Sequence, residues 1–346
     1  MKRLVNRYVT TVILTVMPRE ALSGAPPADP RIAPFINKTV PFRFCGRDLG
    51  FHLSHALFSS FDIDEGTRLL LKTVARDVDL GGVRTALDVG CGVGVIGTCV
   101  KAAVPGVGVT MQDRDALAVA FAGENCRANG LDGVRCECAL AFHGLGDGRF
   151  DLVLSNLPAK AGAPVLTSMI RHAASALTET GIAAIVIVAP LVDFARGAIA
   201  ALGGVIRHEE VTRDYGVFHF QPASPIRETA AERDDIAPYL RTRQDFTARG
   251  VTYGLDTVWS LPDFDTLGRT TELLLEMADE TPAPGSVLVW NPGQGHVPSW
   301  LVGRFGTAVR SLTLAGRDGL ECAIAVRNAR AAGCVAARSI AIPGEP

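Results

Sequence analysis

Three absences in this 346-residue sequence narrow its class before any motif is considered. After the N-terminal region, no apolar run approaches the ~20 residues that a membrane-spanning helix requires, so we expect no membrane association. The eight cysteines and seven histidines show no metal-ligand spacing, so we expect no metal site and interpret the cysteines as reduced thiols of a cytoplasmic protein. The formal net charge of −2 gives no overall basic field that would indicate a nucleic-acid partner, although a local patch would suffice.

The N-terminal region contains an apolar run that resembles a poor secretion signal. Residues 8–17 follow three basic residues, but the run holds three threonines and no A-x-A cleavage site follows it. We therefore expect residues 1–39 to form an N-terminal strand, appended helix or arm. With 48% hydrophobic and 20% charged residues, the chain has the composition of a folded protein, and its length suits two domains.

A glycine-rich turn is the clearest feature that the sequence does contain. Residues 85–97 read T-A-L-D-V-G-C-G-V-G-V-I-G, in which 86–89 predicts a buried strand and a helical pattern begins at Val95. Glycines at such a turn let backbone N–H groups approach a ligand without an intervening side chain. Asp88, at the end of the strand, would face the same crevice. The pattern is typical of a nucleotide site and equally of a plain turn between a core strand and a helix.

Two further strands are predicted to end in polar residues. The strand 107–111 is followed by Asp113, about 20 residues after the glycines, where a carboxylate can accept hydrogen bonds from ribose hydroxyls. A solvated aspartate in a turn is the alternative. The strand 152–155 ends at Asn156. Because ligands bind at the carboxyl ends of parallel strands, we expect Gly90, Asp113 and Asn156 to lie together.

Strands and helices alternate in the sequence after the glycine turn. This alternation predicts an α/β fold with a Rossmann-like, doubly wound and mostly parallel sheet, preceded by a hairpin at 40–51 and completed by a late edge strand at 217–220. Before the glycine turn, D-I-D-E-G-T precedes an apolar helical pattern. We interpret Asp64 and Thr67 there as helix-capping residues, with ligand contact as the alternative.

The order of these motifs resembles that of the class I S-adenosyl-L-methionine (SAM) methyltransferases over residues 40–222. Within that class the chain is most similar to the group with a "small" methyltransferase domain, which includes guanine-N2 methyltransferases of ribosomal RNA. F-S-S-F-D-I-D-E-G-T-R-L-L-L before the glycine turn and S-N-L-P after the fourth strand carry this narrower resemblance. It implies a SAM-dependent methyltransferase that acts on a nitrogen, with RNA guanine N2 as one candidate acceptor.

The resemblance also implies roles for individual residues. The glycine turn would line the methionine part of SAM, Asp113 would hold its ribose, and the catalytic edge would consist of Asn156, Leu157 and Pro158. The implied cofactor-binding residues are Asp88, Gly90, Cys91, Gly92, Gly94, Asp113, Arg114 and Asn156.

Asn156 suits its role on chemical grounds as well. Methyl transfer is an in-line displacement, so the main task is to align the lone pair of the acceptor. The amide of Asn156 can accept a hydrogen bond from an exocyclic NH2 group, and the carbonyl of Leu157 can accept another. Pro158 stiffens the turn that carries both groups.

The substrate-facing motif departs from the pattern of the family, which is N-P-P followed by Phe or Tyr. Here Leu157 replaces the first proline, and Ala159 replaces an aromatic residue whose stacking on a base is worth about 1–3 kcal/mol. The acid that is common at the third strand is also missing, with Ala139 near that position. A small-molecule N- or O-methyltransferase therefore stays open, as does a non-catalytic binding protein with this fold. A nicotinamide-dependent dehydrogenase is disfavoured, because G-C-G-V-G does not match G-x-G-x-x-G.

The C-terminal third repeats the first domain at a separation of about 200 residues. V-L-V-W-N-P-G-Q-G corresponds to A-L-D-V-G-C-G-V-G, but Val289 stands in the position of Asp88 and Gly316 in that of Asp113. We expect residues 40–225 to form the active domain and residues 226–346 a degenerate, truncated Rossmann-like half-domain without activity. Its sheet would have an open edge, so we expect it to pack on the first domain or on a second subunit, which would make a homodimer.

Overall fold

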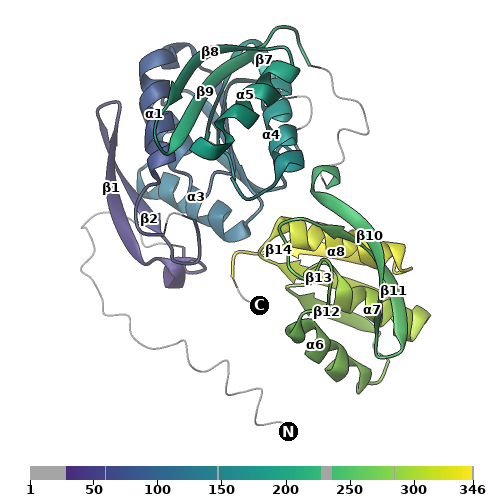
Figure 1. Ribbon diagram of the computed structural model, residues 1–346. Coiled ribbons are helices and arrows are strands. Elements are labelled where there is room, and N and C mark those ends of the chain that lie inside the picture. Colours follow the sequence, from purple (N-terminus) through teal and green to yellow (C-terminus); the bar gives the residue numbers. More distant parts are fainter. Residues whose placement is uncertain (1–28, 59, 146–147, 227–235, 284, 345–346) are drawn as a thin grey trace.

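The computed structural model describes residues 29–58, 60–145, 148–226, 236–283 and 285–344, which form the two lobes of Figure 1. The first region, residues 38–222, contains strands β1 to β9, and the second region, residues 240–341, contains strands β10 to β14. Most of the predicted N-terminal strand or arm lies outside the described residues. In the part of the chain that the structure describes, no helix has the length and apolar character needed to cross a membrane.

A seven-stranded sheet with the order β5-β4-β3-β6-β7-β9-β8 forms the centre of the first region. Its strands are β3 Thr85–Val89, β4 Gly108–Asp113, β5 Val134–Cys138, β6 Phe150–Asn156, β7 Leu177–Val188, β8 Gly204–Val211 and β9 Tyr215–Pro222. Strands β3 to β7 are parallel, and β9 is antiparallel to both β7 and β8. The predicted doubly wound, mostly parallel sheet is thereby confirmed.

The edge of this sheet differs from the prediction. The strand predicted at 217–220 belongs to β9, which lies between β7 and β8 rather than at the edge. Its central residues are buried on both faces, whereas the residues of β8 alternate in burial as expected for an exposed edge strand. The prediction was wrong because β8 is too polar to stand out as a strand of the core.

Helices cover both faces of the sheet (Figure 1). They are α1 Glu65–Asp77, α2 Val95–Ala103, α3 Ala116–Ala128, α4 Ala163–Ser175 and α5 Val192–Ala201. One apolar cluster joins the sheet to α1, α2 and α3, and a second joins it to α4 and α5. Alternate residues of β3 serve the two clusters, since Ala86 belongs to the first and Leu87 to the second. The predicted hairpin consists of β1 Lys38–Phe44 and β2 Arg47–Leu53.

The second region repeats the element order of the first from β1 to β5. A hairpin of β10 Leu240–Ala248 and β11 Val251–Val258 precedes helix α6 Arg269–Asp279 and a parallel sheet of β12 Ser286–Trp290, β13 Ser311–Gly316 and β14 Ala337–Ala341, whose connecting helices are α7 His296–Phe305 and α8 Gly319–Ala331. Asn125 in α3 donates to the carbonyl of His52 in the hairpin, and Asn328 in α8 donates in the same way to Asp256. The similarity therefore extends to the hydrogen bonds that attach each hairpin.

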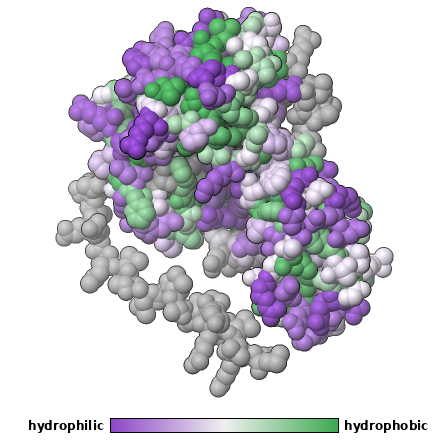
Figure 2. Space-filling view, in the orientation of Figure 1, coloured by the Kyte–Doolittle hydropathy of each residue, from purple (hydrophilic) through white to green (hydrophobic). Residues whose placement is uncertain are grey.

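The two regions pack against each other. Leu320 and Ile324 of α8 are fully buried and belong to the same apolar cluster as Leu140 of the first region. In the face shown in Figure 2, hydrophilic residues gather where the two lobes meet. The second region is therefore attached to the first by both apolar and polar contacts, as one of the two predicted arrangements required.

Candidate functional site

The glycine turn after β3 has a backbone that only glycine adopts readily. Gly90, Gly92 and Gly94 have φ angles of 69°, 53° and 82°. A Cβ on Gly94 would also lie 2.8 Å from the Cα of Ala122 in α3, so this position needs glycine for close packing as well. At Gly90 and Gly92 a Cβ would meet no described atom within 4 Å. The surface above the first two glycines is therefore open to a ligand.

Asp113 lies beside this turn, as predicted. Its Oδ2 accepts a hydrogen bond of 2.9 Å from the N–H of Gly92, and its Oδ1 accepts one of 2.9 Å from the N–H of Asp115. Burial raises the pKa of Asp113, and these two N–H groups oppose the shift. A carboxylate offers about four acceptor positions, so Asp113 can still accept hydrogen bonds from the hydroxyls of a ligand.

Asp88 lies deeper than its position at the end of a strand predicts. The side chain is 1% exposed, and its Oδ2 accepts a hydrogen bond of 2.8 Å from the N–H of Gly97 in α2. Burial raises its pKa to about 7. Its Oδ1 has no hydrogen-bond partner among the described residues. Asp88 thus binds the first turn of α2 and does not face an open crevice. Its Oδ1 is a buried acceptor that a ligand or a water molecule could satisfy.

Cys91 and Arg114, the other two predicted cofactor ligands, use different groups. The N–H of Cys91 donates to the carbonyl of Gln112 at 3.0 Å, and burial raises the pKa of its thiol, so the thiol stays neutral. The guanidinium of Arg114 lies 3.3 Å from the carboxylate of Asp318 in the second region. The structure therefore brings the backbone of Cys91 to the turn and directs the side chain of Arg114 to the contact between the regions.

Asn156 lies at the end of β6, next to the glycine turn because β6 pairs with β3. Its Nδ2 donates to Oδ2 of Asp64 at 2.9 Å and to Oγ1 of Thr67 at 3.1 Å. An ionised carboxylate only accepts hydrogen bonds, so the NH2 side of the amide must face Asp64. The amide orientation is thereby fixed, and Oδ1 is the atom left to accept from a substrate.

Asp64 has two tasks in this arrangement. As predicted, it caps α1, where its Oδ2 accepts from the N–H of Thr67 at 3.1 Å. Its Oδ1 also accepts from the hydroxyl of Tyr215 at 3.1 Å. Gly66 makes this approach possible, because a Cβ there would lie 2.8 Å from the Tyr215 ring. The D-E-G-T motif therefore combines a cap, a partner for Asn156 and room for a tyrosine.

Leu157 and Pro158 follow Asn156 in the predicted catalytic edge. The side chain of Leu157 is buried, and its N–H donates to the carbonyl of Val186 in β7 at 2.9 Å, which a proline could not do. The carbonyl of Pro158 accepts from the N–H of Ala161 at 2.9 Å. Pro158, Ala159 and Lys160 are exposed. The replacement of the first proline thus adds a core contact and a backbone hydrogen bond, while Ala159 offers no ring.

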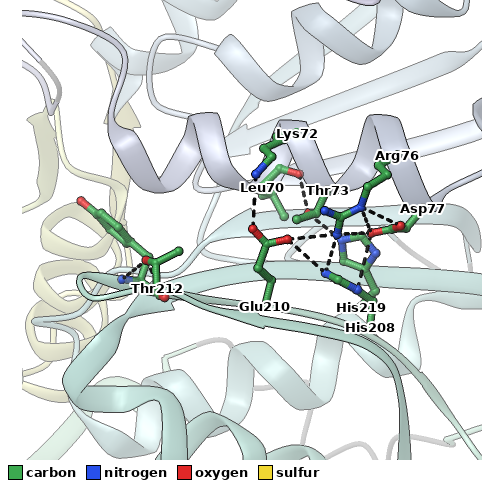
Figure 3. A network of polar contacts seen from close by, with 10 residues as sticks. Leu70, Lys72, Thr73, Arg76, Asp77, His208, Glu210, Thr212 and His219 are labelled. Atoms are coloured by element: carbon green, nitrogen blue, oxygen red, sulfur yellow. Dashed lines mark hydrogen bonds and ion pairs between the residues drawn. The ribbon is translucent and has the colours of Figure 1, made fainter.

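A cluster of polar residues holds the C-terminal half of α1 against β8 and β9 (Figure 3). Arg76 pairs with Glu210 at 3.0 Å, and Lys72 pairs with the same carboxylate at 3.4 Å. Deeper in the contact, Thr73 hydrogen-bonds the ring of His219 at 2.9 Å. Burial lowers the pKa of His219 to about 4, so this ring is neutral at physiological pH. The cluster fixes α1, which Asp64 caps, relative to β8 and β9.

Sequence reasoning missed Tyr215 and the link from Asp64 to Asn156. Both depend on contacts between residues far apart in the chain, and a single tyrosine after a polar loop gives no local signal. The described residues contain no group of three or more side chains suited to a metal ion.

Residues 48–214 match the family model described as the methyltransferase small domain. Protein YbxB of Bacillus subtilis (strain 168), which is uncharacterized, is 30% identical over 145 residues, or 42% of this chain and 71% of that protein. Ribosomal RNA small subunit methyltransferase C of Haemophilus influenzae (strain PittEE) is 39% identical over 102 residues, or 30% of this chain and 29% of that protein.

The chain spans about a third of the length of the curated methyltransferase C relatives, between 29% and 33% of it. A structural neighbour extends further. The 16S rRNA N2 methyltransferase RsmC of T. thermophilus, solved in complex with AdoMet and guanosine, superposes with a TM-score of 0.60 at 19% identity. The superposition covers 88% of this chain and 75% of that chain. Both regions therefore share their fold with the solved structure.

Proposed function

This chain belongs to the methyltransferase small domain family, and from that premise we propose that it is a SAM-dependent methyltransferase acting on a nitrogen of its substrate. The observation that carries the proposal is the orientation of Asn156. Its two donor hydrogen bonds to Asp64 and Thr67 leave Oδ1 as an acceptor next to the glycine turn. An acceptor held in this way suits a methyl acceptor that carries an N–H donor, such as an exocyclic amine.

The residues of the glycine turn fit SAM as cofactor. The open surface above Gly90 and Gly92 would take the amino-acid part, Asp113 would accept from the ribose hydroxyls, and Oδ1 of Asp88 remains a buried acceptor. When bound, SAM supplies an electrophilic methyl group. The carboxylates are suited to a ligand that carries two positive charges, since an opposite charge nearby stabilises the ionised form of a buried acid.

The residues of this chain then orient the acceptor. Oδ1 of Asn156 and the carbonyl of Leu157 would each accept one N–H of an amine, which directs the nitrogen lone pair away from both. Asp64 and Thr67 hold the amide, and Tyr215 holds Asp64. Orientation of this kind can supply a large part of the rate of a displacement reaction. The methyl–sulfur bond of SAM would break as the nitrogen–methyl bond forms, and the extra proton on the methylated nitrogen would be released to water.

For the substrate we propose guanine N2 of an RNA, because the curated relatives are ribosomal RNA methyltransferases and the solved neighbour is a 16S rRNA N2 methyltransferase in complex with guanosine. We propose that an exposed phenylalanine takes the place of the ring missing at Ala159. Phe58 and Phe61, in the loop between β2 and α1, are 73% and 72% exposed, and Phe61 lies only three residues before Asp64. An exposed ring at that place can stack on a planar base, a contact worth about 1–3 kcal/mol.

The test is methyl transfer from radiolabelled SAM to ribosomal RNA that lacks base methylation. We expect label in guanine N2, no label with the Asn156→Ala variant, and a several-fold loss with Phe61→Ala. Label found only in small N- or O-nucleophiles would replace RNA with a small-molecule substrate, which the exposed Ala159 and Lys160 would then suit. Absence of transfer to either class would contradict the proposed activity.

We further propose that residues 226–346 are a degenerate copy of the domain at 40–225 and that they form a homodimer through the open edge of β12. Leu70 in α1 is fully buried, but Leu274, which occupies the same place in the matching sequence T-E-L-L-L, is 46% exposed. Leu87 in β3 is fully buried, and Leu288 in β12 is 58% exposed. β3 pairs with β6, whereas the edge of β12 has no partner strand in the described residues.

Pairing of two β12 strands would cover this edge by symmetry. Light scattering should give a dimer for the wild type and a monomer for Leu288→Arg, and a monomeric wild type would contradict the proposal.

We also propose a cytoplasmic location, since all eight cysteines are free thiols.

A further inference from the structure

The contact between the two regions has a local two-fold symmetry. The N–H of Ala116 donates to the carbonyl of Arg317 at 2.9 Å, and the N–H of Gly319 donates to the carbonyl of Arg114 at 2.7 Å. The side chains follow the same exchange. Arg317 pairs with Asp115 at 2.8 Å, and Arg114 pairs with Asp318 at 3.3 Å. The turn after β4 and the turn after β13 therefore hold each other with equivalent groups.

A single residue, Asp115, connects this contact to Asp113, the proposed ribose-binding carboxylate. The N–H of Asp115 donates to Oδ1 of Asp113, and the side chain of Asp115 caps α3 by accepting from the N–H of Leu117 at 2.9 Å. The second region thus contacts Arg114 and Asp115, the two residues that directly follow Asp113. A shift of Asp115 would move the acceptor oxygen of Asp113, because both lie on the same tight turn.

Arg317 adds a second link that reaches the substrate side. Its Nη2 also donates to the carbonyl of Ala56 at 2.9 Å. Ala56 lies in the loop between β2 and α1, two residues before the exposed ring of Phe58. The guanidinium therefore joins the turn of Asp113 to the loop that precedes Asp64.

We propose that Arg317, contributed by the degenerate region, is a positioning residue for the active region. It fixes the turn of Asp113 for the cofactor and the loop of Phe58 for the substrate. The inference rests on the proposed function, because it assumes that Asp113 holds SAM. It gives the degenerate region a specific task in the reaction, which its own turn cannot perform without a strand-end carboxylate at Gly316.

The test compares Arg317→Ala with Arg304→Ala by calorimetric titration with SAM. Arg304 is a matched control, since it pairs with Asp279 at 2.9 Å within the second region and makes no contact with the first among the described residues. We expect Arg317→Ala to weaken SAM binding about tenfold, the loss that follows when the turn of Asp113 keeps its binding geometry only about a tenth of the time. Arg304→Ala should bind as the wild type does. Arg317→Lys, which can keep only one of the two contacts, should lie between them.

A second measurement does not depend on SAM. Hydrogen exchange of the ligand-free protein should become faster at the amides of Ala116 and Leu57 in Arg317→Ala and stay unchanged there in Arg304→Ala. Wild-type affinity and exchange in Arg317→Ala would overturn the inference while leaving the proposed function intact. A wild type that does not bind SAM would overturn the proposed function itself. Equal losses in both variants would show a general stability effect and also overturn the positioning role.

Discussion

The turns after β3 and β12 have the same backbone shape and different side chains. Gly90, Gly92 and Gly94 have positive φ angles, and so do the residues in the matching places, Asn291, Gly293 and Gly295. In each turn the N–H of the second of these residues donates to a carboxylate. In the first region this acceptor is Asp113 at the end of β4, and in the second it is Glu321 in α8.

The two turns thus have the same backbone shape, but they differ in the side chains that could bind a ligand. A buried N–H group needs an acceptor in any fold. The second region therefore still provides an acceptor for this N–H, although a glycine, Gly316, stands in the position of the acid at the strand end. Glu321 comes from a different element, and Val289 leaves the place of Asp88 without a carboxylate. A left-handed glycine turn therefore does not by itself indicate a cofactor site. We propose that the acids at the ends of the two strands, Asp88 and Asp113, supply that indication.

The largest effect is expected at Asn156, which has no counterpart among the described residues of the second region. Asn156→Ala removes the proposed acceptor for the substrate and should lower kcat about 1,000-fold, within the range found for a single positioned polar group of an active site. Thr67→Val removes one of the two hydrogen bonds to Nδ2 and should lower kcat about tenfold. Single-turnover assays with saturating SAM measure both. An Asn156→Ala enzyme with more than a tenth of the wild-type kcat would contradict the assigned role.

The next effect concerns strands β8 and β9, which cover α1. His219 has a pKa of about 4 because of burial, and His208 nearby adds to this shift, whereas an unfolded histidine has a pKa near 6.5. The unfolded state therefore binds the proton first as the pH falls, so the contribution of His219 to stability is lost between pH 6.5 and 4, by up to about 3 kcal/mol. Asp88, whose pKa burial raises to about 7, contributes in the opposite direction over the same range. Denaturant unfolding from pH 7 to 4 measures this loss. The difference in the free energy of unfolding between the wild type and His219→Gln isolates the contribution of His219 and should fall by up to about 3 kcal/mol from pH 7 to 4, and a difference that does not change with pH would contradict the assignment.

A matched pair of substitutions tests the two turns directly. Asp113→Ala should weaken SAM binding about 30-fold, because the ribose loses a charged acceptor. Glu321→Ala should leave SAM binding unchanged and lower the stability of the second region by about 1–2 kcal/mol, since the N–H of Gly293 loses its acceptor. Calorimetric titration and thermal unfolding of both variants separate the two effects. A loss of SAM affinity in Glu321→Ala would indicate a cofactor role for the second turn.

The smallest effect is expected at Tyr215. Tyr215→Phe keeps the ring beside Gly66 and removes only the hydrogen bond to Asp64, so kcat should fall about fivefold. The change should leave SAM affinity as it is. Wild-type kcat in this variant would mean that Asp64 holds Asn156 without help from β9.

What the sequence could predict follows from how local each signal is. The glycine turn, Asp113 and Asn156 each lie at a strand end, so their neighbourhood followed from the parallel topology once the strands were recognised. The partners of these residues did not follow. Asp64 and Asn156 are 92 positions apart and Tyr215 and Asp64 are 151 apart, and nothing in either segment indicates the other.

The directions of two side chains did not follow from the sequence. Asp88 has the expected place in the chain, but its carboxylate turns inward to the N–H of Gly97. Arg114 follows Asp113 directly, yet its guanidinium is directed to the second region. The position of a residue on a strand fixes which edge it occupies, whereas the direction of its side chain depends on the helix or domain packed against it.

The stoichiometry of SAM binding tests the central claim most directly. Calorimetric titration of the full chain should give one SAM bound per chain, with binding lost or strongly weakened in Asp113→Ala. Two equivalent sites would contradict the claim that the second turn has lost its ligand chemistry. A folded wild type that binds no SAM would contradict the assignment of the first turn.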